Sequence, residues 1–224
     1  MNFFSKPFLV RCAVIIFAMF FTGLGVSLMR ISCMGTDPFS SVNYAISEFC
    51  DIPLGLVVML VSAILLIFCI LFMRKAIGFG MIANMMLLGT SADFWRNILL
   101  SAFPLQENYA GMDEFPLRIL LVCVGILWMI FFTSFYIAAG LGMSSYDALG
   151  FIIEKLSNKK ISFQMARIFT DVLCVLTAYL IASITNNQWT LIGLGTVIMA
   201  FGTGPLLATF KQRIAEPFVN RIAH

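Results

Sequence analysis

Charge is what this sequence of 224 residues has least of, because Asp, Glu, Lys and Arg make up only 11% of it. A soluble domain carries about 25%. Hydrophobic residues account for 61%, with 23 Phe and 14 Met. A chain this apolar cannot cover its own surface with polar groups, which excludes a soluble enzyme, a disordered chain and a coiled coil. The net charge is +3, but the basic residues are scattered singly and in pairs, so no nucleic-acid partner is expected.

Groups that perform catalysis or bind metals are also scarce. The single histidine, His224, is the last residue, and there is no C-x-x-C pair, Walker motif, H-E-x-x-H or G-x-S-x-G. The sequence therefore predicts no enzyme activity, no metal and no cofactor. Of the six cysteines, Cys33 and Cys50 lie towards the same predicted membrane face and are candidates for a disulfide in an oxidising space.

Long hydrophobic runs are abundant. A bilayer core of roughly 30 Å needs about 20 residues of helix, and six stretches qualify: residues 9–28, 54–73, 79–100, 119–139, 163–184 and 190–210. If the N-terminus is cytoplasmic, ten basic residues lie inside and three (Arg30, Arg96 and Arg118) lie near the outer face. This bias follows the positive-inside rule. It predicts a multi-pass membrane protein with both termini in the cytoplasm.

The chain also repeats itself. After the first span comes Gly35-Thr36-Asp37-Pro38-Phe39-Ser40, and after the fourth, 107 positions later, comes Gly142-Met143-Ser144-Ser145-Tyr146-Asp147. In the third span of each half, Gly80, Met86, Gly89 and Thr90 match Gly193, Met199, Gly202 and Thr203 at a spacing of 113. The predicted domains are residues 1–112 and 113–224, each a three-helix repeat. Since three is odd, the second repeat enters the membrane from the opposite side, as in many secondary transporters.

The segment after the first span of each half predicts a short helix. Thr36 or Asp37 can cap the first one, and Ser144 or Ser145 the second. Both are too short to cross a bilayer. Two placements stay open: a helix lying on the membrane surface with its apolar face in lipid, or a re-entrant helix whose N-terminus borders a central cavity.

Polar residues near these helices and within spans are candidates for a substrate site. Asp171 lies far from either end of its span, and Arg167 precedes it by one turn on the same face, so the two can pair. The pair is either self-neutralising and structural, or functional, with Arg167 binding a carboxylate and Asp171 carrying a proton. Asn84 more typically bridges helices. The candidate substrate-binding set is Asp37, Ser40, Asn43, Asn84, Thr90, Ser144, Ser145, Tyr146, Asp147, Arg167, Asp171 and Thr203.

These motifs resemble the YczE/YitT type of small bacterial membrane proteins. The similarity rests on Gly23-Leu24-Gly25-Val26-Ser27-Leu28, on Gly35 to Ser40, and on Gly142-Met143-Ser144-Ser145-Tyr146-Asp147-Ala148-Leu149, where the family pattern has a Gly, a small residue and "WD-L" or "PFD-L". The first copy has Ser40 where that pattern has Asp. The resemblance covers nearly the whole chain. It implies a transporter in the bacterial inner membrane and an amino-acid-like solute.

Two functions follow as hypotheses. The first is a secondary transporter of a small polar or amino-acid-like solute that works by alternating access, with proton coupling through Asp147 and Asp171. The second is a substrate-binding membrane subunit of an ATP-driven vitamin importer, which would need an ATPase partner because the chain has no Walker motif. The expected partners are the lipid bilayer and the solute, with a homodimer left open.

Overall fold

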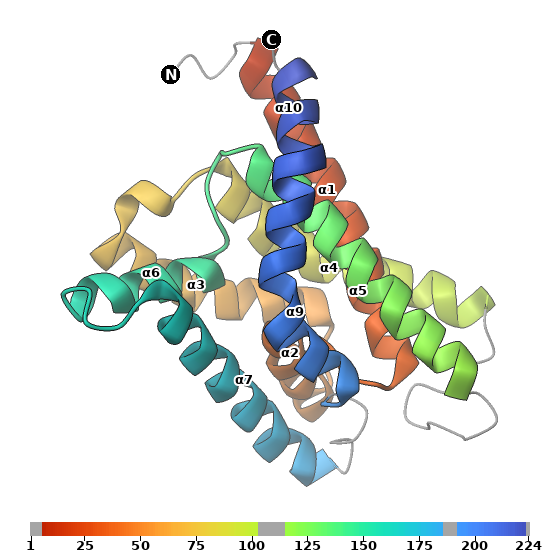
Figure 1. Cartoon of the computed structure of the whole chain (residues 1–224). Coiled ribbons are helices and arrows are strands. Elements are labelled where there is room, and N and C mark those ends of the chain that lie inside the picture. The colour runs from red at the N-terminus through yellow and green to blue at the C-terminus, as the bar shows by residue number, and fades with distance from the viewer. Residues whose placement is uncertain (1–5, 103–114, 186–191, 223–224) are drawn as a thin grey trace.

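The computed structural model describes residues 6–102, 115–185 and 192–222, and within these ranges every regular element is helical. The six long helices are α1 (Lys6–Ser32), α3 (Leu54–Phe72), α4 (Phe79–Ala102), α5 (Phe115–Ala138), α7 (Phe163–Thr185) and α9 (Leu194–Phe210). The shorter ones are α2 (Pro38–Cys50), η1 (Arg74–Ala76), α6 (Ser145–Leu156), the π-turn η3 (Lys211–Ala215) and α10 (Glu216–Ile222). Figure 1 shows their arrangement.

The predicted all-helical class is confirmed, and each of the six predicted spans coincides with a long helix. Four of these helices, α1, α3, α5 and α7, are long and apolar enough to cross a membrane. The helix α9 has only 17 residues, and Asn84, Asp93 and Arg96 lower the mean hydropathy of α4. The six-span count and the inverted repeat stay predictions. The predicted boundary between residues 112 and 113 lies outside the described residues.

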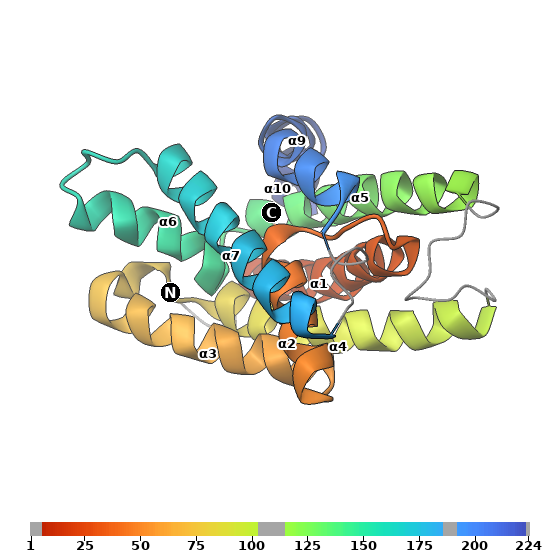
Figure 2. The same ribbon diagram turned by 90° about the horizontal axis from the view of Figure 1, so that it is seen from below.

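The centre of the fold is the antiparallel pair α1 and α5, which lie side by side in Figures 1 and 2. Glycine on each helix lets the two backbones approach. A Cβ on Gly25 would lie 2.8 Å from the Met129 Cβ, and a Cβ on Gly125 would lie 2.8 Å from the Met29 Cγ. Small residues at such crossings are typical of helices packed in lipid.

The third long helix of each half packs on its first, so α4 covers α1 and α9 covers α5. The Ser27 hydroxyl donates to the Ala92 carbonyl at 2.7 Å, and the Trp95 indole donates to the Phe20 carbonyl at 3.0 Å. The second long helices differ from each other. The helix α3 packs closely on α4, where a Cβ on Gly89 would lie 2.8 Å from the Gly55 Cα.

The two short helices cross over between the halves, because α2 packs mainly on α7 while α6 contacts both α3 and α7. The first two turns of α2, from Pro38 to Ala45, are buried in protein. In α6, Tyr146, Ala148 and Ile152 are buried, the residues between them are buried or partly buried, and the exposed residues are Lys155 and Leu156 at its C-terminal end. The N-terminal turns of both helices therefore lie inside the protein. This differs from the first predicted placement, in which the helices lie on the membrane surface.

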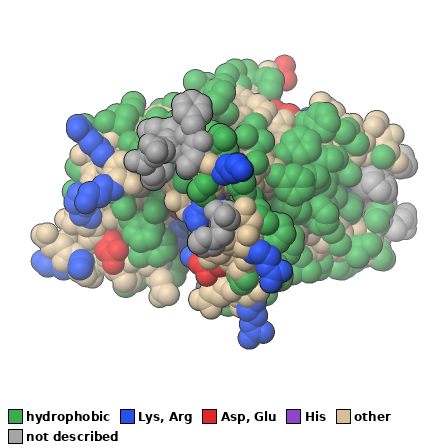
Figure 3. All heavy atoms as spheres, turned by 90° about the horizontal axis from the view of Figure 1, so that it is seen from above, with side chains coloured by type: hydrophobic (Ala, Val, Ile, Leu, Met, Phe, Trp, Pro, Cys, Tyr) green, Lys and Arg blue, Asp and Glu red, His purple; other side chains and the backbone are tan. Residues whose placement is uncertain are grey.

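Lys and Arg side chains gather at the end of the molecule where the two termini lie (Figure 3). The helix α10 contacts α1, and seen from this end, Lys and Arg side chains gather on the left and in the middle of the surface, while hydrophobic side chains cover the right (Figure 3). The proposed cysteine pair is absent, since Cys33 is buried, Cys50 is exposed and both are free thiols.

The tight crossing of α1 and α5 makes a stability prediction. Replacing Gly125 by Val should lower the free energy of unfolding by about 1–3 kcal/mol, because the new side chain overlaps Met29 and the Gly25 carbonyl. The melting temperature of the purified protein in detergent measures this. The control is Gly204→Ala on α9, where a Cβ meets nothing within 4 Å. Equal melting temperatures for the two variants would contradict the close crossing.

Candidate functional site

The N-termini of α2 and α6 are built alike. Asp37 caps α2 and accepts from the Ser40 N–H at 3.0 Å, and Ser144 caps α6 and accepts from the Asp147 N–H at 3.0 Å. The cap residues have nearly the same backbone angles, φ −64° and ψ 155° against φ −63° and ψ 151°. Both caps are therefore among the predicted alternatives. The carboxylate is the cap in the first half and stands three residues later in the second.

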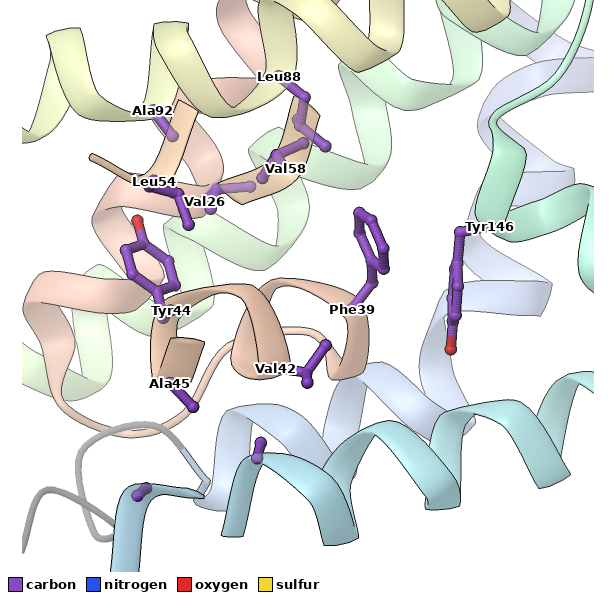
Figure 4. Close-up of a cluster of buried hydrophobic side chains, with 12 residues drawn as sticks. Val26, Phe39, Val42, Tyr44, Ala45, Leu54, Val58, Leu88, Ala92 and Tyr146 are labelled. Carbon is purple, nitrogen blue, oxygen red and sulfur yellow. The ribbon is translucent and has the colours of Figure 1, made fainter. Parts of the chain in front are cut away.

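The two helix starts meet through an aromatic pair. The Phe39 ring stacks on the Tyr146 ring, with centroids 4.8 Å apart and planes inclined by 27°. Figure 4 shows the two rings facing each other across the space between α2 and α6. Phe39 and Tyr146 are also the residues that the repeat aligns with each other, so this contact joins equivalent positions of the two halves.

A charged cluster, which consists of Asp147, Arg167 and Asp171, lies beside Tyr146. The Arg167 guanidinium forms an ion pair with Asp147, and its Nε lies 3.4 Å from the Asp171 Oδ1. The Tyr146 hydroxyl donates to the same Asp171 oxygen at 2.5 Å, and the guanidinium carbon lies 4.7 Å from the centroid of the Tyr146 ring. The predicted pairing of Arg167 with Asp171 is present. Because Arg167 also pairs with Asp147, both carboxylates of the cluster compete with any incoming carboxylate.

The cluster is partly open. The exposed fraction is 33% for the Arg167 side chain, 30% for Asp147 and 15% for Asp171. Two cavities lie elsewhere. One of about 450 Å³ is lined by apolar side chains of α1, α5 and α10, and one of about 350 Å³ is lined by Arg30, Glu48, Asp93, Arg96 and their neighbours. The cluster is therefore an open site rather than part of either cavity.

Asp37 is close enough to the charged cluster for the charges of Asp171 and Arg167 to affect its pKa. Burial raises the pKa of its carboxyl, the charge of Asp171 raises that pKa further, and Arg167 lowers it. Only one of its oxygens is satisfied. Oδ2 accepts from Ser40, whereas the buried Oδ1 has no hydrogen-bond partner within the described ranges.

Of the remaining candidate residues, two lie on the short helices and three lie away from the charged cluster. The Asn43 amide donates to the Phe39 carbonyl at 2.6 Å, one turn back on α2, and Ser145 is buried at the start of α6. Three others do not join the charged cluster. Asn84 donates to the Met19 sulfur, which is the helix-bridging role, and the hydroxyls of Thr90 and Thr203 bond to carbonyls of their own helices.

Sequence reasoning missed two structural arginines. The Arg11 guanidinium, at the start of α1, donates to the Ala139 carbonyl at 3.0 Å, just beyond the end of α5. The fully buried Arg118, at the start of α5, donates to the Ile31 carbonyl at 3.0 Å and to that of Ser32 at 3.5 Å. Both pairs obey the spacing of 107 that relates Gly35 to Gly142, which is the signal that could have identified them.

Backbone contacts at the turns repeat in the same way. The Gly80 N–H donates to the Leu141 carbonyl at 2.8 Å, and the Gly195 N–H donates to the Met34 carbonyl at 2.8 Å. Gly35 and Gly142, which follow those carbonyls, have φ of 96° and 113°, a conformation that favours glycine. Gly80 therefore corresponds to Gly195, and the match of Gly80 with Gly193 was displaced by two residues.

Comparison with known proteins shows that the sequence is similar to several bacterial proteins. A family model described as "Family of unknown function (DUF6198)" matches residues 9–212. Uncharacterized protein YyaS of Bacillus subtilis is 26% identical over 88% of this chain and 90% of its own. Uncharacterized membrane protein YczE of the same organism is 26% identical over 84% of this chain and 81% of its own, which confirms the YczE-type resemblance. An uncharacterized protein of Haemophilus influenzae is 23% identical over 91% and 84%. No solved structure matches.

The charged cluster predicts how Arg167 affects stability. Arg167→Gln should lower the free energy of unfolding by about 1–3 kcal/mol, because Asp147 and Asp171 are then left close together without a counter-charge. Adding Asp147→Asn should restore part of the loss. Thermal unfolding in detergent measures both. Lys211→Gln, which breaks the exposed pair with Glu216, is the control and should cost less than about 1 kcal/mol. A loss no larger than the control's would contradict a stabilising role for Arg167.

Proposed function

We propose that this chain, which belongs to the Family of unknown function (DUF6198), is a secondary transporter that carries a small polar solute across the bacterial inner membrane by alternating access. It is a membrane protein with several apolar helices and a membrane-protein relative. In this proposal α4 and α9 complete six spans. The solute binds at the charged cluster, the reaction involves no covalent step, and Asp147 and Asp171 exchange the coupled proton.

The observation that carries the proposal is the reciprocity of contacts between the halves. Arg11 caps the end of α5, and Arg118 caps the end of α1. The turn after α5 receives the start of α4, and the turn after α1 receives the start of α9. Such exchanges are what two repeats related by a two-fold axis in the membrane plane would produce.

The halves differ in how the second long helix packs on the third, and this difference supports a state that opens to one side of the membrane. The helix α3 packs on α4 at Gly89, whereas among the described residues α7 has no comparable packing on α9. Gly204, the α9 position that the corrected register matches to Gly89, has open space where a side chain would point. In Figure 1 the ribbons of α7 and α9 diverge towards the end where the termini lie.

This difference supports a state that is open on one side. With cytoplasmic termini, the contact of α3 with α4 closes the outer side, while the start of α7, with Arg167 and Asp171, faces the inner side. In the opposite state α7 packs on Gly204 and α3 leaves Gly89. Two inverted halves give two packings of similar energy, which is the condition for alternating access.

The proposed orientation is testable without knowing the solute. Alkaline phosphatase needs disulfides and is active only outside the cytoplasm. A fusion after the last residue should therefore be inactive, and one after Ile52, between α2 and α3, should be active. Activity is measured in intact bacteria, with expression of both fusions checked by immunoblot. The reverse pattern would contradict cytoplasmic termini.

The alternating packing makes a transport prediction. Gly204→Trp should leave the melting temperature nearly unchanged, because the position is open in this state, yet lower the initial rate of uptake about tenfold or more by blocking the approach of α7. Uptake is measured in liposomes with radiolabelled amino acids and simple amines, tested one at a time.

The matched control is Val197→Trp on the same helix, an exposed position, which should transport normally. If the unchanged chain takes up none of these solutes, the transporter proposal fails. If Gly204→Trp transports as well as the control, α7 does not close on α9.

A further inference from the structure

The site contains buried acceptors that lack a donor. Asp37 is only 8% exposed, and its Oδ1 has no partner among the described residues. The Asn43 Oδ1, on the same short helix, is also buried and unpartnered there. A buried acceptor without a donor costs about 1–3 kcal/mol. The Asp37 Oδ1, at the start of α2, can therefore accept a hydrogen bond from an N–H group of a ligand.

The site also has more carboxyl groups than cations. Asp37, Asp147 and Asp171 supply three carboxyl groups to this neighbourhood, and Arg167 is the one cation that pairs with any of them in the described contacts. Charges within an apolar region are retained only when they are compensated. The site therefore has room for positive charge, whereas an added carboxylate would increase the imbalance.

The aromatic pair has the matching chemistry. The face of a Tyr or Phe ring attracts a cation within about 6 Å of its centroid. Arg167 already lies over Tyr146 in this way, at 4.7 Å, so the site holds one tethered cation. Since Arg167 and Phe39 occupy the two faces of the Tyr146 ring, a second cation would meet the Phe39 ring, which lies next to the cap of α2.

We propose that the group recognised by this site is a protonated amine, which binds at Asp37 and Asp171 beside the Phe39–Tyr146 pair. This assignment rests on the proposed transport function and names its substrate class. Its N–H groups donate to the Asp37 Oδ1, and its charge offsets the excess carboxylate. Arg167 then holds Asp147 and Asp171 in place, in contrast to the carboxylate-binding role expected from the sequence.

The test uses the full chain purified in detergent and simple ions as probes. Ethylammonium chloride should raise the melting temperature by about 2–4 °C, with saturation, because it binds the folded state. Tetramethylammonium chloride, which has charge but no N–H, should have a clearly smaller effect. Sodium chloride and sodium acetate at equal ionic strength should have none beyond that of salt.

Variants locate the effect. Asp37→Asn should abolish the ethylammonium shift. If that variant does not fold, Asp37→Ser replaces it, since Ser caps the equivalent helix in the second half. The control is Asp51→Asn, an exposed carboxylate with φ of 54°, a conformation that Asn tolerates, and it should keep the full shift.

The outcomes separate the two proposals. A shift that persists in the Asp37 variants, or is equally large with tetramethylammonium or sodium, would overturn the amine site. So would stabilisation by acetate instead of ethylammonium. Ethylammonium binding that depends on Asp37, together with no uptake of any amine or amino acid by liposomes, supports the site but overturns transport. Uptake of an anionic solute without any ethylammonium shift supports transport but overturns the amine.

Discussion

The exchange of arginines between the two central helices is the interaction on which the fold depends. The last carbonyls of a helix have no partner within that helix, and in a membrane protein water is not always available to them. Arg11 donates to the Ala139 carbonyl beyond the end of α5, and Arg118 donates to the last carbonyls of α1. Each half therefore completes the other's first long helix. The two halves form one unit because neither satisfies its backbone alone.

This central pair divides the molecule into a tightly held part and a looser one. α1 and α5 are locked by glycine contacts, and α4 and α9 are each anchored at their first turn on the other half's loop. Among the described residues, neither α3 nor α7 has a backbone hydrogen bond of this kind at its first turn. α3 is held by packing on Gly89, and α7 is held mainly by α2 and α6. The residues of the charged cluster lie on α6 and α7, in the part with the fewest restraints.

The sequence predicts what depends on local patterns. Runs of apolar residues located the long helices, Pro38 after Asp37 marked the start of α2, and the spacing of Arg167 and Asp171 predicted their pair. The contacts of Tyr146 with Asp171 and of Asp147 with Arg167 depend on how α6 crosses α7, which no local pattern encodes. The third spans were matched two residues out of register because glycine recurs often along them. Arg11 and Arg118 were read only as topology signals, although the same side chains cap helices.

The N-caps of α2 and α6 use different residue types at equivalent positions, and this has a consequence for the mechanism. Asp37 and Ser40 stand where Ser144 and Asp147 stand in the other half, so each of the two short helices carries one carboxylate in its first turn, at a different position. Asp171 on α7 adds a second carboxylate from the second half. A ligand that contacts both Asp37 and Asp171 contacts both halves. Its binding energy then depends on how the halves are packed, and only such a difference lets a ligand shift an equilibrium between two packings. A ligand held by one half alone would make the same contacts in either packing and would drive no movement.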